Sequence, residues 1–270
     1  RSTLSPSSAA SDVYKRQDGG STSKKNVGRY TIYTYLKYCG VRSLDYVFIS
    51  HPDKDHVNGI YELIELCDNT FEIGTVVLPG ISRAAAVKKQ ADDDMSKLER
   101  ILKNAGINVV YADAGDCIKS GGFSVKCMHP CEGYDYESAN DYSAVYLVEY
   151  GDFSMLMTGD AEKKAEKCII EDVNSMTGDA GEPARLVSVN ILKVGHHGSK
   201  GASSEEFLSY VKPETALISC GAGNSYGHPH TQTLQRLSGI GAKVYRTDES
   251  GEIAVRVRDG LYKIEVFKAL

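Results

Sequence analysis

Histidine and aspartate are concentrated in a few short segments of this chain. The densest is the hexapeptide His-Pro-Asp-Lys-Asp-His at residues 51–56, which follows the apolar run 46–49. That run is β-branched and aromatic, is closed by Ser50 and Pro52, and predicts a buried strand, while helical spacing of apolar residues begins at Asn58. We therefore expect a loop between strand and helix whose imidazole and carboxylate groups suit one or two divalent cations. The alternative is a solvated acidic turn.

Asp160 repeats this placement. It directly follows the expected strand 153–158, which pairs in a tight hairpin with the strand 143–150, and it precedes a Lys/Glu-rich helix. An aspartate in this place is either a metal ligand or the N-cap of the helix, and taken alone the position favours the cap.

Two pairs of histidines follow further strands. His196 and His197 are flanked by glycines at the end of the expected strand 187–194, and glycine allows close approach of the backbone to another group. His228 and His230 lie in a glycine-rich segment after the next strand. Surface histidines without a role are the alternative, but the repeated pattern favours a site.

These clusters contain six of the seven histidines and lie at the ends of four expected strands. Strands that end at one edge of an α/β sheet bring such groups together. We therefore expect one site with two cations about 3.5–4 Å apart, the spacing of binuclear hydrolytic centres.

The remaining pattern predicts an alternation of strands and helices, which is typical of a sheet with helices packed on a face. The expected strands are 46–49, 75–79, 108–111, 123–128, 143–150, 153–158, 187–194, 215–219, 243–246, 252–257 and 261–267. The expected helices are 27–38, 58–66, 92–105, a helix that begins at Ala161, 204–211 and 231–237.

Length and composition limit the class of protein. The 270 residues allow one large domain or two small ones, and 41% hydrophobic and 25% charged content is typical of an ordinary soluble globular protein. No apolar run approaches about 18 residues, so no segment is expected to span a membrane. The net charge of −5 argues against a strong grip on nucleic acid by bulk electrostatics but is compatible with a local basic rim.

The seven cysteines are odd in number and irregularly spaced, which indicates no disulfide framework. Cys127, His129 and Cys131 resemble part of a zinc site, but no second cysteine pair completes it. Residues 1–17 are rich in Ser and Ala, so we expect a disordered leader or a sequence scar, with the folded domain at 18–270. Asp18 begins that domain abruptly, and we expect the first strands of the fold to lie upstream.

The motifs together resemble the metallo-β-lactamase superfamily, and specifically the hydrolase domain at the C-terminal end of ComEC, the DNA-internalisation protein of natural competence. The matching segments are 51–56, 158–160, 192–199 and 226–230, and the resemblance covers 18 to about 267. Asp53 stands where the superfamily core has a second histidine, and this substitution also resembles the ComEC branch.

The resemblance implies a four-layer αβ/βα sandwich with the site along one edge, between its sheets. It implies two divalent cations, Zn²⁺ or Mn²⁺. The implied ligands are His51 and Asp53 for the first cation, Asp55, His56 and His196 for the second, and Asp160 as a bridge. Further residues that the resemblance brings to the site are Asp18, Asn140 and His197. Asn140 lies near the place where the superfamily often has a histidine, which leaves the first cation with fewer protein ligands.

The implied activity is phosphodiester hydrolysis, with one DNA strand as substrate during uptake. The catalytic residues would be Asp55, Asp160, His228 and His230, of which either histidine would protonate the leaving alkoxide. The alternatives are a hydrolase of a small or cell-wall phosphodiester and a metal-stabilised binding module without activity. If the parent chain is a full ComEC, a membrane channel domain precedes this one, which is then extracytoplasmic and membrane-tethered.

Overall fold

The computed structural model describes residues 25–67, 71–80, 89–131, 140–175, 188–258 and 260–267. The expected leader at 1–17 and Asp18 lie outside these residues, so their interpretation stays a prediction. None of the helices in the described part of the chain is long and apolar enough to cross a membrane.

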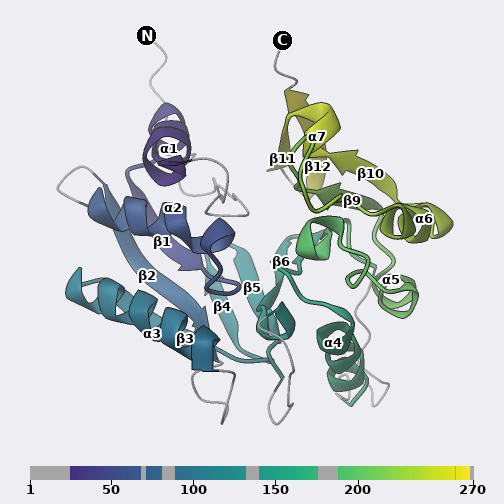
Figure 1. The fold of residues 1–270 in the computed structure, drawn as a ribbon, viewed down its shortest axis with the longest axis horizontal. Helices are drawn as coiled ribbons and strands as arrows, with labels where there is room; N and C mark the ends of the chain where they lie inside the picture. Colours follow the sequence, from purple (N-terminus) through teal and green to yellow (C-terminus); the bar gives the residue numbers. More distant parts are fainter. Residues whose placement is uncertain are drawn as a thin grey trace.

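Four layers make up the structure (Figure 1). One group of helices covers a three-stranded sheet, a seven-stranded sheet packs behind it, and a second group of helices covers the far face. Buried apolar residues form one cluster between each pair of adjacent layers. This is the αβ/βα sandwich that the sequence predicts, and it requires each sheet to bury both of its faces.

The first half of the chain forms the outer helices on one side and the small sheet, in the order β1-β2-β3. Its elements are a π-helical turn η2 (Gly28–Ile32), α1 (Tyr33–Tyr38), β1 (Ser43–Phe48), α2 (Lys54–Glu65), β2 (Glu72–Pro79), α3 (Lys89–Asn104) and β3 (Asn108–Ala112). Adjacent strands are parallel because helices α2 and α3 form the crossovers between them.

The second half forms the large sheet, in the order β10-β9-β8-β7-β6-β5-β4. Its elements are β4 (Cys117–Ser120), β5 (Phe123–His129), a 3₁₀ turn η4 (Asn140–Tyr142), β6 (Val145–Tyr150), β7 (Phe153–Met157), α4 (Lys163–Ser175), β8 (Ile191–Lys193), a second 3₁₀ turn η5 (Gly195–Gly198), α5 (Glu205–Val211), β9 (Thr215–Ile218), α6 (Thr231–Gly239) and β10 (Lys243–Arg246). Strands β7 to β10 are parallel, so their carboxyl ends share one edge of the sheet.

The last elements are a short helix and a hairpin, namely α7 (Thr247–Ser250), β11 (Glu252–Arg258) and β12 (Leu261–Phe267). The hairpin was predicted from the sequence, but α7 was not. Apolar residues of β11 and β12 pack against the large sheet around Phe153, Met155 and Leu217.

The start of α2 differs from the prediction. The helix begins at Lys54 and not at Asn58, so Asp55 and His56 lie in its first turn and not in a loop. Asp53 holds the N-cap position with extended backbone angles (φ −62°, ψ 147°), and an acidic residue in the first turn interacts favourably with the helix dipole. The helix therefore fixes the orientation of both side chains.

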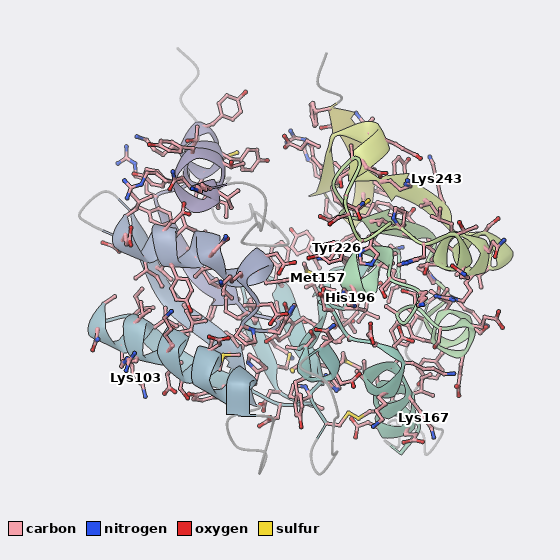
Figure 2. The ribbon with its side chains drawn as sticks, viewed as in Figure 1. Lys103, Met157, Lys167, His196, Tyr226 and Lys243 are labelled. Carbon is pink, nitrogen blue, oxygen red and sulfur yellow. A yellow bond between two sulfur atoms is a disulfide. The ribbon has the colours of Figure 1, made fainter. Side chains whose placement is uncertain are left out.

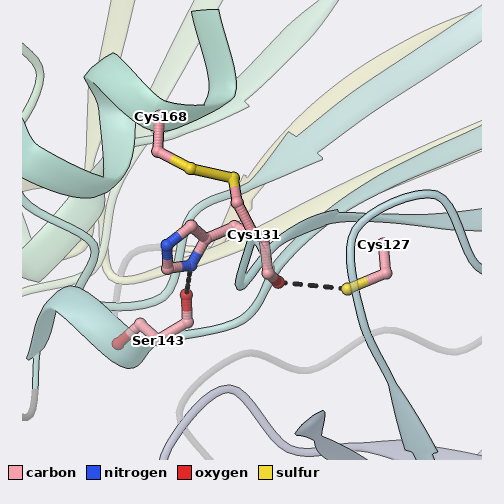
Figure 3. The surroundings of a disulfide bond; sticks show 5 residues. Cys127, Cys131, Ser143 and Cys168 are labelled. Carbon is pink, nitrogen blue, oxygen red and sulfur yellow. Dashed lines mark hydrogen bonds between the residues drawn. A yellow bond between two sulfur atoms is a disulfide. The ribbon is translucent and has the colours of Figure 1, made fainter. Parts of the chain in front are cut away.

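One disulfide joins Cys131, just after β5, to Cys168 in α4 (Figure 3). The expectation of no disulfide framework was wrong in this respect. The two cysteines are 37 residues apart, and they meet because α4 packs against the sheet that contains β5. Their spacing in the sequence carries no signal of that packing.

Candidate metal centre

Loops from both halves of the chain converge between the two sheets. The segment after β1 contributes the residues from His51 to His56, and the ends of β7, β8 and β9 contribute Asp160, the pair in η5, and the loop to α6. Figure 2 shows His196 where the two halves of the molecule meet. The predicted convergence of distant segments is therefore present.

Asp160 lies at the middle of this cluster and is 5% exposed. Its Oδ2 is 3.7 Å from both His51 Nε2 and His196 Nε2. Its Oδ1 is 3.4 Å from His56 Nε2 and 4.0 Å from His197 Nε2. One carboxylate thus faces two pairs of imidazoles, one pair at each oxygen.

Two more carboxylates border these pairs. Asp53 Oδ2 lies 3.9 Å from His51 Nε2. Asp55 Oδ2 lies 3.5 Å from His197 Nε2 and 3.8 Å from His56 Nε2. Two groups of three side chains have ligand atoms within 4.8 Å of one another, namely His51, His56 and Asp160, and Asp55, His56 and His197.

Hydrogen bonds hold two of the imidazoles by their Nδ1 atoms. His196 Nδ1–H donates to Glu162 Oε1 at 2.8 Å, and His197 Nδ1–H donates to the Ser219 carbonyl at 2.8 Å. In each ring Nε2 is the nitrogen that faces Asp160. A metal-binding histidine generally donates its other N–H to a carboxylate or carbonyl in this way, so both rings are oriented for coordination.

The backbone at η5 is strained. His196 (φ 45°) and His197 (φ 52°) both adopt left-handed conformations, which non-glycine residues avoid at a cost on the order of 1–3 kcal/mol each. The glycines on either side admit close neighbours, since a Cβ on Gly198 would lie 2.6 Å from Pro229 Cβ. Strain of this kind persists where surrounding structure fixes the geometry, and it is common at functional sites.

The loop of Asp160 is tied to its neighbours. The Asp160 amide donates to Ser143 Oγ at 3.2 Å, and the Gly159 carbonyl accepts from His196 N at 3.0 Å. Gly159 has φ +50°, and a Cβ there would lie 2.8 Å from Ser50 Cβ. Asp160 is therefore held by segments on both sides, and it does not cap α4, which begins at Lys163.

The charges of the site perturb its titrating groups. Burial alone would raise the pKa of Asp160, but its hydrogen bond to His56 and the nearby His51 and His197 hold that pKa far below its usual range. A hydrogen bond to His197 lowers the pKa of Asp55, while burial and the charge of Asp55 raise the pKa of Asp53.

This donor set fits divalent cations. Imidazole Nε2 atoms and carboxylate oxygens converge in a buried space, and three acidic groups there repel one another unless cations neutralise them. The predicted cation cofactors are therefore compatible with the side chains present. The identity of the metal, Zn²⁺ or Mn²⁺, stays a prediction.

The structure groups the histidine pair differently from the implied ligand assignment. His197, and not His196, lies with Asp55 and His56. His196 lies on the side of His51, and its Nδ1 is 3.4 Å from the Asn140 amide nitrogen. Asn140 thus lies on the Nδ1 side of His196, away from the Nε2 that faces Asp160. His129 is fully buried outside this cluster, and its Nδ1 is hydrogen-bonded to the Ser143 carbonyl.

His228, His230 and Tyr226 line the outer side of the histidine pair. The His228 ring lies 5.6 Å from that of His196 and 5.0 Å from that of His230. Tyr226 is 69% exposed and stacks on His228 with ring centroids 5.8 Å apart. Burial and the neighbouring histidines lower the pKa of His228 to about 4, so its ring is neutral at neutral pH.

Sequence reasoning missed Glu162 and Ser143, which position His196 and Asp160. Glu162 has a weak signal in hindsight, since it follows the Thr-Gly-Asp segment by two residues, but any acidic residue next to a charged helix gives the same signal. Ser143 has none. Lys193, which flanks the histidine pair, is 4% exposed and donates to the Val194 carbonyl at 3.2 Å, so of the two flanking lysines only Lys200 is exposed.

Three curated relatives match most of this chain. ComE operon protein 3 of Bacillus subtilis is 29% identical over 242 residues, which are 90% of this chain and 28% of that protein. Recombination protein 2 of Haemophilus influenzae is 29% identical over 88% of this chain and 25% of its own length. Competence protein ComA of Neisseria gonorrhoeae is 30% identical over 81% of this chain and 26% of its own length.

The chain therefore spans about a quarter of the length of the curated relatives that it matches. No family model matches it. Among solved structures, a mutant form of the CmlA β-hydroxylase shares the fold over 88% of this chain and 48% of its own, with TM-score 0.51 and 14% identity. The metallo-beta-lactamase fold protein YhfI from Bacillus subtilis gives TM-score 0.45 and 11% identity over 80% of this chain and 78% of its own. The chain has the metallo-β-lactamase fold and is a homologue of the ComEC-type competence proteins.

Proposed function

We propose that this chain is a binuclear metal-dependent phosphodiesterase whose substrate is one strand of DNA during uptake. The observation that carries the proposal is the position of Asp160, whose two oxygens each face a separate pair of imidazoles. A carboxylate in that position fits a bridge between two cations. Homology to competence proteins supports the choice of substrate.

The grouping of side chains suggests how two cations would be held. His51, Asp53 and His196 would hold the first, and Asp55, His56 and His197 would hold the second, with Asp160 shared. In this assignment His196 supplies the imidazole that Asn140 does not. Bound there, divalent cations would lower the pKa of a water molecule and neutralise charge on a phosphoryl oxygen.

The residues of the chain have separate tasks in this proposal. Glu162 and Ser219 orient His196 and His197 through their Nδ1 atoms, and Asp160 would orient the attacking water. His230 is preferred over His228 as the group that passes a proton to the leaving alkoxide, because the low pKa of His228 leaves it neutral.

Tyr226 supports a nucleic-acid strand over a small diester. It is an exposed aromatic ring directly beside the histidines, and exposed aromatic side chains stack on unpaired bases at about 1–3 kcal/mol per base. The net charge of −5 favours the alternative of a small or cell-wall phosphodiester. Salt dependence separates the two, because binding of a DNA strand weakens steeply with salt.

The disulfide supports a location outside the reducing cytoplasm. If the parent chain contains a membrane channel, this domain would then be tethered on the outer side, where incoming DNA is accessible.

The test is to load the purified chain with Zn²⁺ or Mn²⁺, measure the metal content, and offer single-stranded DNA, double-stranded DNA and bis(p-nitrophenyl) phosphate. Cleavage of the single strand that falls with added salt supports the proposal. Cleavage of the small diester alone favours the alternative substrate. Absence of any cleavage with two cations bound refutes the hydrolase and leaves a metal-stabilised binding module.

A further inference from the structure

A second cluster of potential metal ligands lies behind the first site. Cys131 follows β5, Cys168 lies in α4, and the two form a disulfide (Figure 3). A ring nitrogen of His129 and both sulfur atoms lie within 4.8 Å of one another. The cluster connects the end of β5 to α4, and its two cysteines are 37 residues apart in the sequence.

His129 is prepared to act as a ligand. Its Nδ1–H donates to the Ser143 carbonyl at 2.8 Å, which makes Nε2 the nitrogen that carries the lone pair. Zinc-binding histidines generally donate one ring N–H to a backbone carbonyl or a carboxylate in this way and coordinate through the other nitrogen.

The composition of the cluster suits a soft divalent cation. Two thiolates and one imidazole are ligands that select zinc and similar metals. Two thiolates also cancel the charge of a divalent cation, which matters because His129 and Cys168 are at most 1% exposed. Cys131 is half-buried, and a water molecule would supply the fourth tetrahedral ligand.

Cys127 does not belong to the cluster, although the sequence places it near. Its Sγ donates to the His129 carbonyl at 3.0 Å, and the group of ligand atoms that lie within 4.8 Å of one another contains His129, Cys131 and Cys168 but not Cys127. The zinc-like pattern of Cys127, His129 and Cys131 in the sequence therefore points to the wrong cysteine. The fold supplies Cys168 in its place.

We propose that His129, Cys131 and Cys168 form a second metal site that is controlled by redox state. Under oxidising conditions the two sulfur atoms form the disulfide. An external dithiol reduces it by exchange, attacking at Cys131, and is itself oxidised to a disulfide while Cys131 and Cys168 become thiols. Binding of a zinc-type cation then releases one proton from each thiol to solvent.

The second site is connected by hydrogen bonds to Asp160 of the first site. His129 bonds to the Ser143 carbonyl, and Ser143 Oγ accepts from the Asp160 amide. Either the disulfide or a bound cation would hold β5 and α4 together behind Asp160. Reduction would thus replace the disulfide by a bound cation, and β5 and α4 would stay connected as long as a soft cation is present.

The experiment uses the full chain, reduced with a dithiol, desalted anaerobically and titrated with Co²⁺. Thiolate ligation gives a sulfur-to-cobalt charge-transfer band in the near ultraviolet, and the ligand set proposed for the first site contains no cysteine that would produce it. We expect the band in the reduced chain, its loss in the oxidised chain, in Cys131→Ser and in Cys168→Ser, and its retention in the matched control Cys127→Ser. Absence of the band in the reduced chain, its retention in Cys168→Ser, or its loss in a folded Cys127→Ser protein overturns the proposal.

A second measurement needs no variant and so does not depend on variant folding. The reduced wild-type chain is alkylated with and without Zn²⁺, and each cysteine is quantified by mass spectrometry. We expect Zn²⁺ to protect Cys131 and Cys168, while the exposed Cys117 is labelled equally in both samples. Equal labelling of Cys131 with and without Zn²⁺ contradicts the site.

Discussion

Glu162 gives the sharpest test of the metal centre, because it acts on one imidazole only. Its carboxylate accepts a hydrogen bond of 2.8 Å from His196 Nδ1 and is 31% exposed. Glu162→Gln keeps the shape and an acceptor oxygen but removes the charge. Loss of such an orienting carboxylate costs about 10–100-fold in metal affinity. The neutral amide still accepts the hydrogen bond, so we expect about tenfold, or about 1.4 kcal/mol.

The pH dependence of this loss distinguishes a charge effect from a structural one. Burial acts to lower the pKa of His196, but the hydrogen bond to Glu162 and the charges of Asp160 and Glu162 raise it above 6.5 overall. A proton competes with the metal below that pKa. In Glu162→Gln the pKa falls, so competition moves to lower pH. The affinity ratio between wild type and variant should therefore be largest at alkaline pH and narrow as pH falls.

The raised pKa of His196 also determines how the stability of the metal-free chain depends on pH. Because the pKa of His196 is raised in the folded state, its contribution to stability is fully present below about 6.5 and is lost as pH rises through the folded-state pKa. Glu162→Gln should remove this contribution, so that variant and wild type unfold at more similar denaturant concentrations at alkaline pH than at about pH 6.

The assay is competition for Zn²⁺ against a fluorescent chelator between about pH 6 and pH 8, with both cations resolved by stoichiometry. Glu72→Gln, an exposed glutamate at the start of β2, is the matched control. The reasoning fails if Glu162→Gln leaves the affinity for both cations unchanged or if the loss of affinity is the same at every pH. It also fails if the affinities for the two cations fall equally, because His196 is assigned to the first cation alone.

Three other predictions address the site, the substrate and the fold. Asp160→Asn should reduce bound metal from two ions per chain to one at most, as measured by elemental analysis, and two tight ions in this variant would remove the bridge from the proposal. Tyr226→Ala should weaken binding of single-stranded DNA by about 5–150-fold through lost stacking, with cleavage of a small diester unchanged, and equal losses for both substrates would contradict a stacking role. Gly28→Ala should lower the free energy of unfolding by about 1–3 kcal/mol, because its Cβ would lie 2.2 Å from the Gly59 carbonyl oxygen. Gly239→Ala, which meets nothing within 4 Å, is the control in the same denaturant titration.

The layered fold and the convergence of the motifs could be predicted because each rests on a local pattern. Short apolar runs that end in glycine, aspartate or histidine mark strand ends, and parallel strands such as β7, β8 and β9 bring those ends to one edge. The pairing of β6 with β7 follows equally directly from Gly151 at the turn. No tertiary information is needed for these steps.

The assignment within the histidine pair could not be predicted, because it depends on backbone angles that the sequence does not reveal. His196 and His197 are adjacent, and the left-handed conformation of both residues sends one ring toward Asn140 and the other toward Asp55. The disulfide escaped prediction for a related reason. Only the packing of α4 on the large sheet makes Cys168 a neighbour of Cys131.

In the phosphodiesterase proposed above, the charges of the first site would account for selectivity toward a diester although the protein is acidic overall. Two divalent cations carry four positive charges, and Asp53, Asp55 and Asp160 carry three negative charges when ionised, which leaves one positive charge at the site. A phosphodiester carries one negative charge and therefore balances it. With a histidine at position 53, the excess would be two, which suits a dianionic phosphomonoester better. In the proposed function Asp53 would thus favour diesters over monoesters, and Asp53→His should shift the preference toward a monoester substrate such as p-nitrophenyl phosphate.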